Sequence, residues 1–211
     1  MNQASAAPRL ILASASPART ATLAQAGIAH AVEVSEVDEE QLVANSGVKD
    51  PAETALLLAR AKAENVAEHT ENALVLGCDS VFELDGVAYG KPLTAELARE
   101  RLRAMSGRTG ILHTGHWLIN TYDGESPTTA GRLASASVQF GTLSDAEIDA
   151  YVATGEPLWV AGSFTIDGRG AAFINGVEGD PHTVVGLSVS TLRSLLAEMS
   201  FSITDFWNPT A

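Results

Sequence analysis

Short apolar runs alternate with helix-like segments in the first half of the chain. Residues 10–13 and 73–76 are apolar throughout, which predicts two buried strands. Asp50-Pro51 predicts the start of a helix over residues 50–68, because Asp caps helices and Pro suits the first helical position. The polar, acidic stretch between Val32 and Ser46 is expected to be a strand end followed by a loop.

The second half of the chain is richer in strand patterns. Residues 110–120 and 132–140 predict long strands around a loop centred on Asp123-Gly124, and residues 160–166 and 171–174 predict a hairpin around Asp167-Gly168. Further helices are expected over residues 94–105, 144–154 and 188–199. This order of elements predicts a mixed α/β fold in which helices flank a central sheet, with a cleft between two lobes.

The length and composition suit a single domain. We expect this domain over residues 9–200, with a disordered tail over residues 1–8 and a C-terminal tail over residues 201–211. The chain has 211 residues, of which 45% are hydrophobic, enough for a sizeable core. No apolar run is long enough to cross a membrane, and the first nine residues lack the apolar core of a signal peptide, so we expect a cytoplasmic location.

The chain is acidic, with 13 basic and 26 acidic side chains and a formal net charge of −13. Because proteins that bind long DNA or RNA carry basic surfaces, such partners are not expected. Small phosphorylated substrates are compatible with this charge, since a few cations can be gathered in one cleft. The single cysteine, Cys78, excludes an internal disulfide or a multi-cysteine zinc site and is expected to be a small buried residue.

The turn after the first predicted strand combines features of an anion site. Ser16 and Pro17 predict a helix cap and a first helical residue, so free backbone N–H groups follow the strand. Ser14 and Ser16 add hydroxyl donors, and Arg19 adds a planar set of donors that suits phosphate. An ordinary capped helix would show the same pattern, and the turn lacks the glycines of a P-loop.

Four further charged residues could carry chemistry, namely Glu39, Lys62, Asp79 and Lys91. Asp79 comes directly after an apolar strand, which predicts a carboxylate at the edge where open α/β sheets bind ligands. Such a carboxylate can position a metal or take a proton from water, although Asp is also common in plain turns. Glu39 could equally belong to a solvated acidic run, and the two lysines could be ordinary surface residues.

Several short motifs occur together and in a fixed order. They are Leu-Ile-Leu-Ala-Ser-Ala-Ser-Pro-Ala-Arg at 10–19, Ser-Glu-Val-Asp-Glu at 35–39, Ala-Lys-Ala at 61–63, Gly-Cys-Asp-Ser at 77–80, Gly-Lys-Pro at 90–92, Met-Ser-Gly-Arg at 105–108, Ala-Gly at 161–162, Ile-Asp-Gly at 166–168 and Val-Gly-Leu at 185–187. Each motif is weak alone. Together, from about residue 9 to about residue 197, they resemble the Maf family, the Maf-like nucleoside triphosphate pyrophosphatases.

The resemblance implies hydrolysis of a nucleoside triphosphate between its α- and β-phosphates. The products are a nucleoside monophosphate and pyrophosphate, and the implied cofactor is a divalent metal, Mg²⁺ or Mn²⁺. It also implies an α/β fold similar to that of the inosine triphosphate pyrophosphatases, a homodimer and a cytoplasmic location. Members of the family are linked to the removal of non-canonical nucleotides and to the inhibition of septum formation.

The resemblance also assigns roles by position. It makes Asp79 the proton acceptor, because this residue matches the aspartate to which the family gives that role. Glu39 matches an acidic residue of the site, for which we expect metal binding. The residues that it implies for substrate binding are Ser14, Ser16, Arg19, Lys62 and Lys91.

The chain departs from the family pattern at a few positions. Ala18 stands where the family usually has the first of two arginines, and Trp159-Val160 stands where it often has Asp-Lys. Asp167 stands where pyrimidine-preferring members often have Gln. These changes leave open which base the nucleotide substrate carries, including a modified base. They also admit a second hypothesis, that the protein is a nucleotide-binding regulator of cell division with little catalysis.

Overall fold

A single mixed sheet organises the protein, for which the computed structural model describes residues 8–122 and 127–208. Among these residues seven strands form the sheet in the order β2-β1-β3-β5-β6-β7, and β4 pairs with β3. The strands β2, β1 and β3 are parallel, and the other pairings are antiparallel. Their bounds are β1 Leu10–Ala13, β2 Ala31–Val32, β3 Leu74–Leu84, β4 Val87–Tyr89, β5 Thr109–Asn120, β6 Thr128–Phe140 and β7 Ile174–Glu178.

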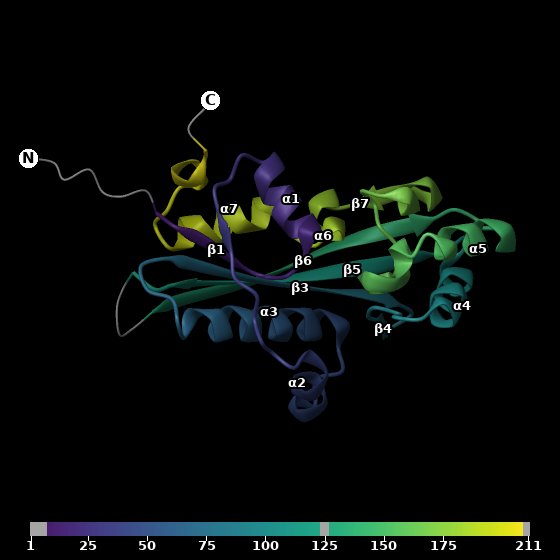
Figure 1. Ribbon diagram of the computed structural model, residues 1–211, viewed down its shortest axis with the longest axis horizontal. Coiled ribbons are helices and arrows are strands. Elements are labelled where there is room, and N and C mark those ends of the chain that lie inside the picture. The colour runs from purple at the N-terminus through teal and green to yellow at the C-terminus, as the bar shows by residue number, and fades with distance from the viewer. Residues whose placement is uncertain (1–7, 123–126, 209–211) are drawn as a thin grey trace, which may run out of the picture.

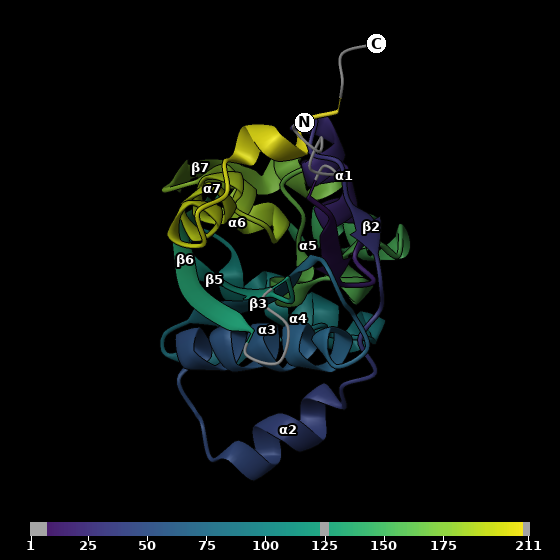
Figure 2. The same ribbon diagram turned by 90° about the vertical axis from the view of Figure 1, so that its left-hand side faces the viewer.

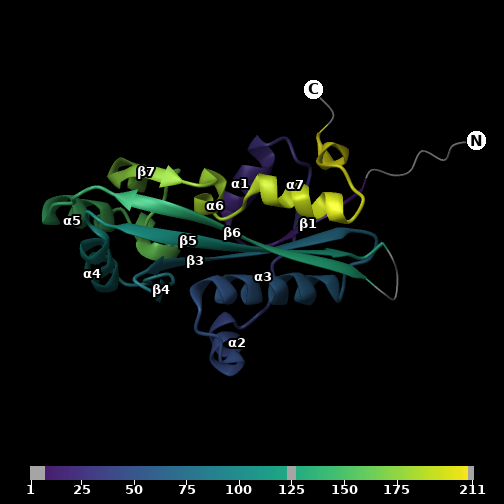
Figure 3. The same ribbon diagram turned by 180° about the vertical axis from the view of Figure 1, so that it is seen from behind.

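Helices cover both faces of this sheet, so the predicted mixed α/β fold is confirmed (Figure 1). On one face lie α1, α6 and α7; on the other lies α3, with α2 outside it (Figures 2 and 3). The helices α4 and α5 pack together at one end of the sheet. The helical bounds are α1 Pro17–Gln25, α2 Glu39–Ser46, α3 Pro51–Ala67, α4 Ala95–Met105, α5 Asp145–Ala153, α6 Pro181–Val185 and α7 Val189–Glu198, and the 3-10 turns are η1 Glu156–Trp159, η2 Ala161–Ser163, η3 Arg169–Phe173 and η4 Ile203–Phe206.

Two glycines let α3 lie directly on the sheet. A Cβ atom on Gly77 of β3 would come within 2.1 Å of the Ala59 carbonyl oxygen. A Cβ atom on Gly115 of β5 would come within 2.3 Å of the Ala55 carbonyl oxygen. Because neither position can hold a side chain, the α3 backbone approaches the strands closely and places Lys62 above β3.

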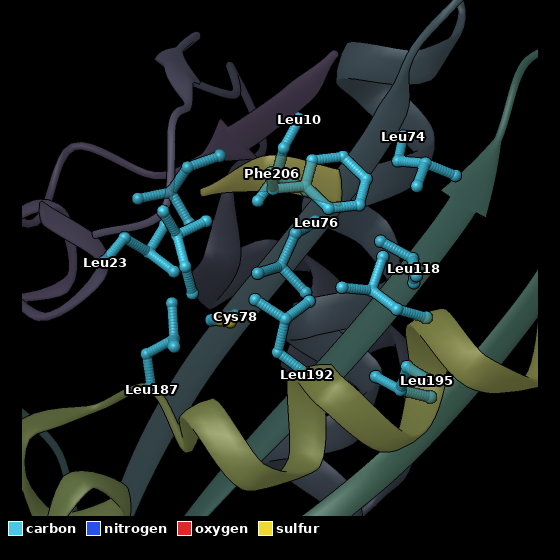
Figure 4. Close-up of a cluster of buried hydrophobic side chains, with 13 residues drawn as sticks. Leu10, Leu23, Leu74, Leu76, Cys78, Leu118, Leu187, Leu192, Leu195 and Phe206 are labelled. Atoms are coloured by element: carbon cyan, nitrogen blue, oxygen red, sulfur yellow. The ribbon is translucent and has the colours of Figure 1, made fainter. Parts of the chain in front are cut away.

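A large apolar cluster fills the opposite face of the sheet (Figure 4). It joins β1 and β3 to α1 and α7, and it includes Cys78, so the prediction of a small buried cysteine is confirmed. Burial raises the pKa of the Cys78 thiol to about 12, which keeps this thiol protonated at neutral pH. Phe206 of η4 also packs in this cluster, so residues beyond 200 contribute to the core.

Helix starts follow the sequence closely. Asp50 caps α3 with its side chain, and Ser144 and Glu147 form a reciprocal capping box at α5. The helix predicted over residues 188–199 is confirmed as α7, with Leu192, Leu195 and Leu196 buried. In the part of the chain that the structure describes, no helix is long and apolar enough to span a membrane.

Two local predictions outside the candidate site are wrong. The stretch expected to be a loop before Ser46 contains α2, which Asp38 caps by accepting a hydrogen bond from the Gln41 N–H. The hairpin expected over residues 160–174 is absent; this stretch forms η2 and η3, and the strand β7 starts only at Ile174. Asp123-Gly124, the expected loop centre, lies outside the described residues.

Candidate active site

The site lies where one edge of β3 has no neighbouring strand. Pairing with β1 ends at Gly77, and pairing with β4 begins at Phe82, so residues 78–81 face an opening in the sheet. Asp79 and Ser80 lie in this opening, and because side chains alternate along a strand they point to opposite faces. The prediction that Asp79 follows the end of its strand is wrong, since β3 continues to Leu84 and it is β1 that stops.

On the α3 face, Lys62 joins two carboxylates. Its Nζ lies 2.6 Å from Asp79 Oδ1 and 2.7 Å from Glu39 Oε1. Asp79 and Lys62 are each only 7% exposed, whereas the Glu39 side chain is 43% exposed at the start of α2. Three residues from α2, α3 and β3 that the sequence marked separately therefore meet in one cluster.

Burial sets the protonation behaviour of Asp79. It raises the pKa of this carboxyl above its ordinary value, although the positive charges of Lys62 and Arg19 act in the opposite direction. The negative charge of Glu39 adds to the rise. Among the described residues, hydrogen bonds to the Asp79 carboxyl reach only Oδ1, so Oδ2 is available to accept a proton.

On the other face, Arg19 lies at the start of α1 and is 8% exposed. Its guanidinium donates to Ser14 Oγ over 2.9 Å, to Ser80 Oγ over 3.2 Å and to the Gly186 carbonyl oxygen over 2.8 Å. Within residues 8–122 and 127–208, no carboxylate pairs with it. Buried charges normally have an opposite charge beside them, so this guanidinium is suited to an anionic ligand.

The turn between β1 and α1 has the predicted form. Ser16 caps α1, its Oγ accepting from the Arg19 N–H, and Pro17 is the first helical residue. Ser14 Oγ accepts a hydrogen bond from the Ser16 N–H over 3.2 Å. The hydroxyl groups, the first turn of α1 and the guanidinium therefore lie together beside the opening in the sheet.

One cavity of about 410 Å³ joins these groups. All seven residues singled out from the sequence line it, namely Ser14, Ser16, Arg19, Glu39, Lys62, Asp79 and Lys91. Lys91 is exposed and comes from the loop between β4 and α4. The volume of the cavity suits a small organic ligand.

The structure adds residues that the sequence did not mark. Ser80 Oγ lies 2.9 Å from Thr114 Oγ1, which donates to the Thr183 carbonyl oxygen and so fixes the hydroxyl that Arg19 contacts. Thr165 also lines the cavity, as does Trp159, which the sequence had marked only as a departure from the family pattern. Ser80 was within reach because it adjoins Asp79, but Thr114 becomes relevant only through the pairing of β5 with β3.

Glu39 and Asp79, which meet at Lys62, are a pair of carboxylates that could hold a divalent cation here. Both already contact Lys62, and among the described residues there is no cluster of three or more acidic, His or Cys ligands. Mg²⁺ commonly uses one or two carboxylates, with water and substrate phosphates completing its shell. The residues present fit a metal that arrives with a phosphorylated substrate, but they do not form a complete protein cage.

A comparison with protein families identifies the chain at this point. The family described as "Maf-like protein" matches residues 9–199. The chain belongs to this family. Similar curated proteins are named "Nucleoside triphosphate pyrophosphatase": one from Leifsonia xyli is 51% identical over 95% of this chain and 97% of its own length, and one from Streptomyces coelicolor is 53% identical over 95% of each.

A solved structure is also similar, a HAM1 protein from Coxiella burnetii. The match covers 90% of this chain and 99% of that one, with 13% identity and a TM-score of 0.40. At that TM-score the likeness carries no argument about function.

Proposed function

We propose that this protein is a nucleoside triphosphate pyrophosphatase, which releases pyrophosphate and leaves a nucleoside monophosphate. The observation that carries this proposal is the buried Arg19, which has no carboxylate partner in the described residues and lines the same cavity as Asp79. An anion beside Arg19 and a water molecule beside Asp79 would bring substrate and nucleophile together. The names of the similar proteins from Leifsonia xyli and Streptomyces coelicolor support the same activity.

The proposed reaction uses the two sides of the opening differently. Arg19, Lys91 and the hydroxyls of Ser14 and Ser16 hold the phosphates, and Lys62 balances charge near the reacting centre. Asp79 accepts a proton from a water molecule as its oxygen bonds to the α-phosphorus. The bond from that phosphorus to the bridging oxygen breaks, and the electron pair leaves on pyrophosphate. The nearby cations stabilise the negative charge that develops on the leaving group.

We propose that a divalent metal, Mg²⁺ or Mn²⁺, takes part, with Glu39 as its main protein ligand and Asp79 beside it. When bound, such a metal neutralises phosphate charge and orients the phosphoryl group. A homodimer and a cytoplasmic location, which the family resemblance implies, stay predictions of the sequence.

The test is pyrophosphate release from a panel of ordinary and modified nucleoside triphosphates, with Mg²⁺ or Mn²⁺, for the wild type and Asp79→Asn. We expect release that needs the metal and is lost by at least about a hundredfold in the variant, as for removal of a positioned acid–base group. Asp79→Asn should stay folded at neutral pH, because a buried carboxyl with a raised pKa destabilises the fold as it ionises.

The matched control is Asp145→Asn, which removes an exposed carboxylate paired with Arg103 on the surface. This variant should keep wild-type activity. Full activity in Asp79→Asn would remove Asp79 as the proton acceptor. Nucleotide binding by wild type without release from any triphosphate would instead favour the regulator of cell division, for which Ala18 and Val160 in the cavity wall are the departures to examine.

A further inference from the structure

An indole lies exposed on the wall of the cavity. Trp159 is 67% exposed and lines the same cavity as Arg19, Asp79 and Lys91. A large aromatic side chain left in water at a cavity usually marks contact with a ligand, because burying it would be favourable. Nothing in the proposed hydrolysis uses this side chain.

Phe164, the other aromatic residue that lines the cavity, already packs in the hydrophobic core. Phe164 is 5% exposed and packs edge-on against Phe82 and Phe140, with ring centroids 5.3 Å and 4.9 Å apart. Within the described residues, Trp159 takes part in no such ring pair. It is therefore the aromatic surface that a ligand in this cavity can reach.

The fold holds Trp159 beside the loop of Lys91. Trp159 ends the short turn η1, and the carbonyl oxygen just before it, on Leu158, accepts a hydrogen bond from the Leu93 N–H over 3.1 Å. Lys91 is two residues from Leu93, so a cation and an aromatic surface lie on neighbouring segments of the wall. A second exposed apolar side chain, Val34, lines the cavity from the segment after β2.

We propose that Trp159 is the stacking platform for the base of the nucleoside triphosphate. This inference rests on the proposed function: Arg19 and Lys91 take the phosphates, and the indole takes the flat face of the base. Because every base offers a π-face, stacking tolerates different bases and strengthens with ring area. The expected order of affinity is a purine triphosphate, then a pyrimidine triphosphate, then inorganic tripolyphosphate, which has no base.

The experiment measures binding without turnover. Dissociation constants are determined for α,β-methylene analogues of a purine and a pyrimidine triphosphate and for tripolyphosphate, with wild type, Trp159→Ala and Trp159→Phe. In Trp159→Ala we expect analogue binding to weaken by about tenfold, tripolyphosphate binding to stay unchanged and the purine preference to disappear. Trp159→Phe should restore most of the loss, and in turnover Trp159→Ala should raise KM with little change in kcat.

Trp207→Phe is the matched control, since Trp207 is 56% exposed but does not line the cavity. It should bind like wild type. Analogue binding in Trp159→Ala equal to that of wild type would overturn the inference, as would an equal loss of tripolyphosphate binding. A change of oligomeric state in place of weaker binding, seen by light scattering, would assign the indole to a contact between copies of the chain. The proposed function has its own readout, which is pyrophosphate release by wild type. If wild type binds the analogues but releases no pyrophosphate, catalysis is contradicted, while the binding data still test the stacking of the base on Trp159.

Discussion

Two buried cations line the cavity in different electrostatic states. Lys62 lies between the carboxylates of Glu39 and Asp79, so its charge is balanced by the protein. Arg19 contacts only hydroxyl and carbonyl oxygens among the described residues, so no carboxylate pairs with it directly and Asp79 acts on it without a hydrogen bond. Because a buried charge without a directly paired counter-charge is costly, the guanidinium should attract the most negative part of a ligand more strongly than Lys62 does.

The protonation of Asp79 can be tested with two opposite substitutions. Removing a neighbouring cation should raise its pKa further, and removing a neighbouring anion should lower it. We therefore expect Lys62→Met to move the carboxyl titration to higher pH and Glu39→Gln to move it to lower pH. The measurement is an NMR titration of the Asp79 carboxyl carbon without nucleotide or metal. In wild type, the acid limb of the pH profile of kcat/KM should lie above pH 3.8, the ordinary pKa of an aspartate.

Arg99→Gln serves as the control for that pair, since it breaks an ion pair on the surface with Asp149 and should leave the titration of Asp79 unchanged. Shifts of the same sign in Lys62→Met and Glu39→Gln would show that repacking, and not charge, governs this carboxyl.

At the scale of elements, the stretch from η1 to η3 forms one wall of the cavity and depends on a single carboxylate. Glu156 Oε1 accepts from the Tyr151 hydroxyl over 3.0 Å, from Thr165 Oγ1 over 2.6 Å and from the Gly170 N–H over 3.0 Å. Its other oxygen accepts from the Arg169 N–H. Partial burial opposes ionisation of Glu156, but these hydrogen bonds outweigh it and lower its pKa. A loop without regular pairing is thus tied to the end of α5.

We predict that Glu156→Ala lowers the free energy of unfolding by about 1–3 kcal/mol, because several donors lose their acceptor. It should also raise KM, since Thr165 and Asp167 of the released loop line the cavity. Glu156→Gln keeps an oxygen for most of these donors and should recover much of both losses. Urea denaturation and steady-state kinetics give the two readouts.

A control for Glu156 lies on α5, the helix that precedes it. Glu147→Ala removes the capping box of α5 and should lower stability without changing KM. If Glu156→Ala loses stability while its KM stays at the wild-type value, the carboxylate supports the fold but does not position the wall of the cavity.

This wall also shows why part of the structure could not be predicted from sequence. Helix starts such as Asp50-Pro51 depend on neighbours in the chain, and they were predicted correctly. Residues 160–166 alternate in a way typical of a strand, yet Gly162 and Ser163 have positive φ angles of 72° and 63°, which a strand does not allow. Glu156, the acceptor that ties the following Thr165 and Gly170, comes from an earlier turn, so no local pattern reveals it.

At the scale of the whole molecule, the site results from strands of unequal length. The sequence predicts β1 and the first part of β3, but it does not predict that β3 runs unbroken through Asp79 to Leu84, seven residues beyond Gly77, where pairing with β1 ends. That difference creates the opening in which Asp79 and Ser80 lie on opposite faces. The individual site residues were singled out from the sequence and given roles by the family resemblance, while the pairing of Lys62 with Glu39 and Asp79 required the fold.

Near the site, His116 on β5, which is fully buried, links the sheet to α7. Its Nε2 accepts a hydrogen bond from the Ser188 N–H over 2.8 Å, at the cap of α7, and its Nδ1 lies 3.1 Å from the Thr114 carbonyl oxygen. Burial, helped by the charge of Arg19, lowers the pKa of His116 to about 4. The neutral ring with its proton on Nδ1 satisfies both contacts, so protonation would break the link to α7.

Stability should therefore depend on pH through this residue. The unfolded chain takes up the His116 proton near pH 6.5, whereas the folded protein does so only near pH 4, so the free energy of unfolding falls as the pH drops through that window. Between pH 7 and pH 4.5 the expected loss from this residue is about 2 kcal/mol. His116→Gln keeps an acceptor for Ser188 but cannot titrate. Over the same interval, the free energy of unfolding of this variant should therefore fall by about 2 kcal/mol less than that of wild type. Urea denaturation of both proteins at the two pH values measures the difference, in which the contributions of carboxylates common to both cancel. Equal losses in the two proteins would mean that the folded protein takes up the His116 proton at the same pH as the unfolded chain, so that burial does not lower the pKa of this residue.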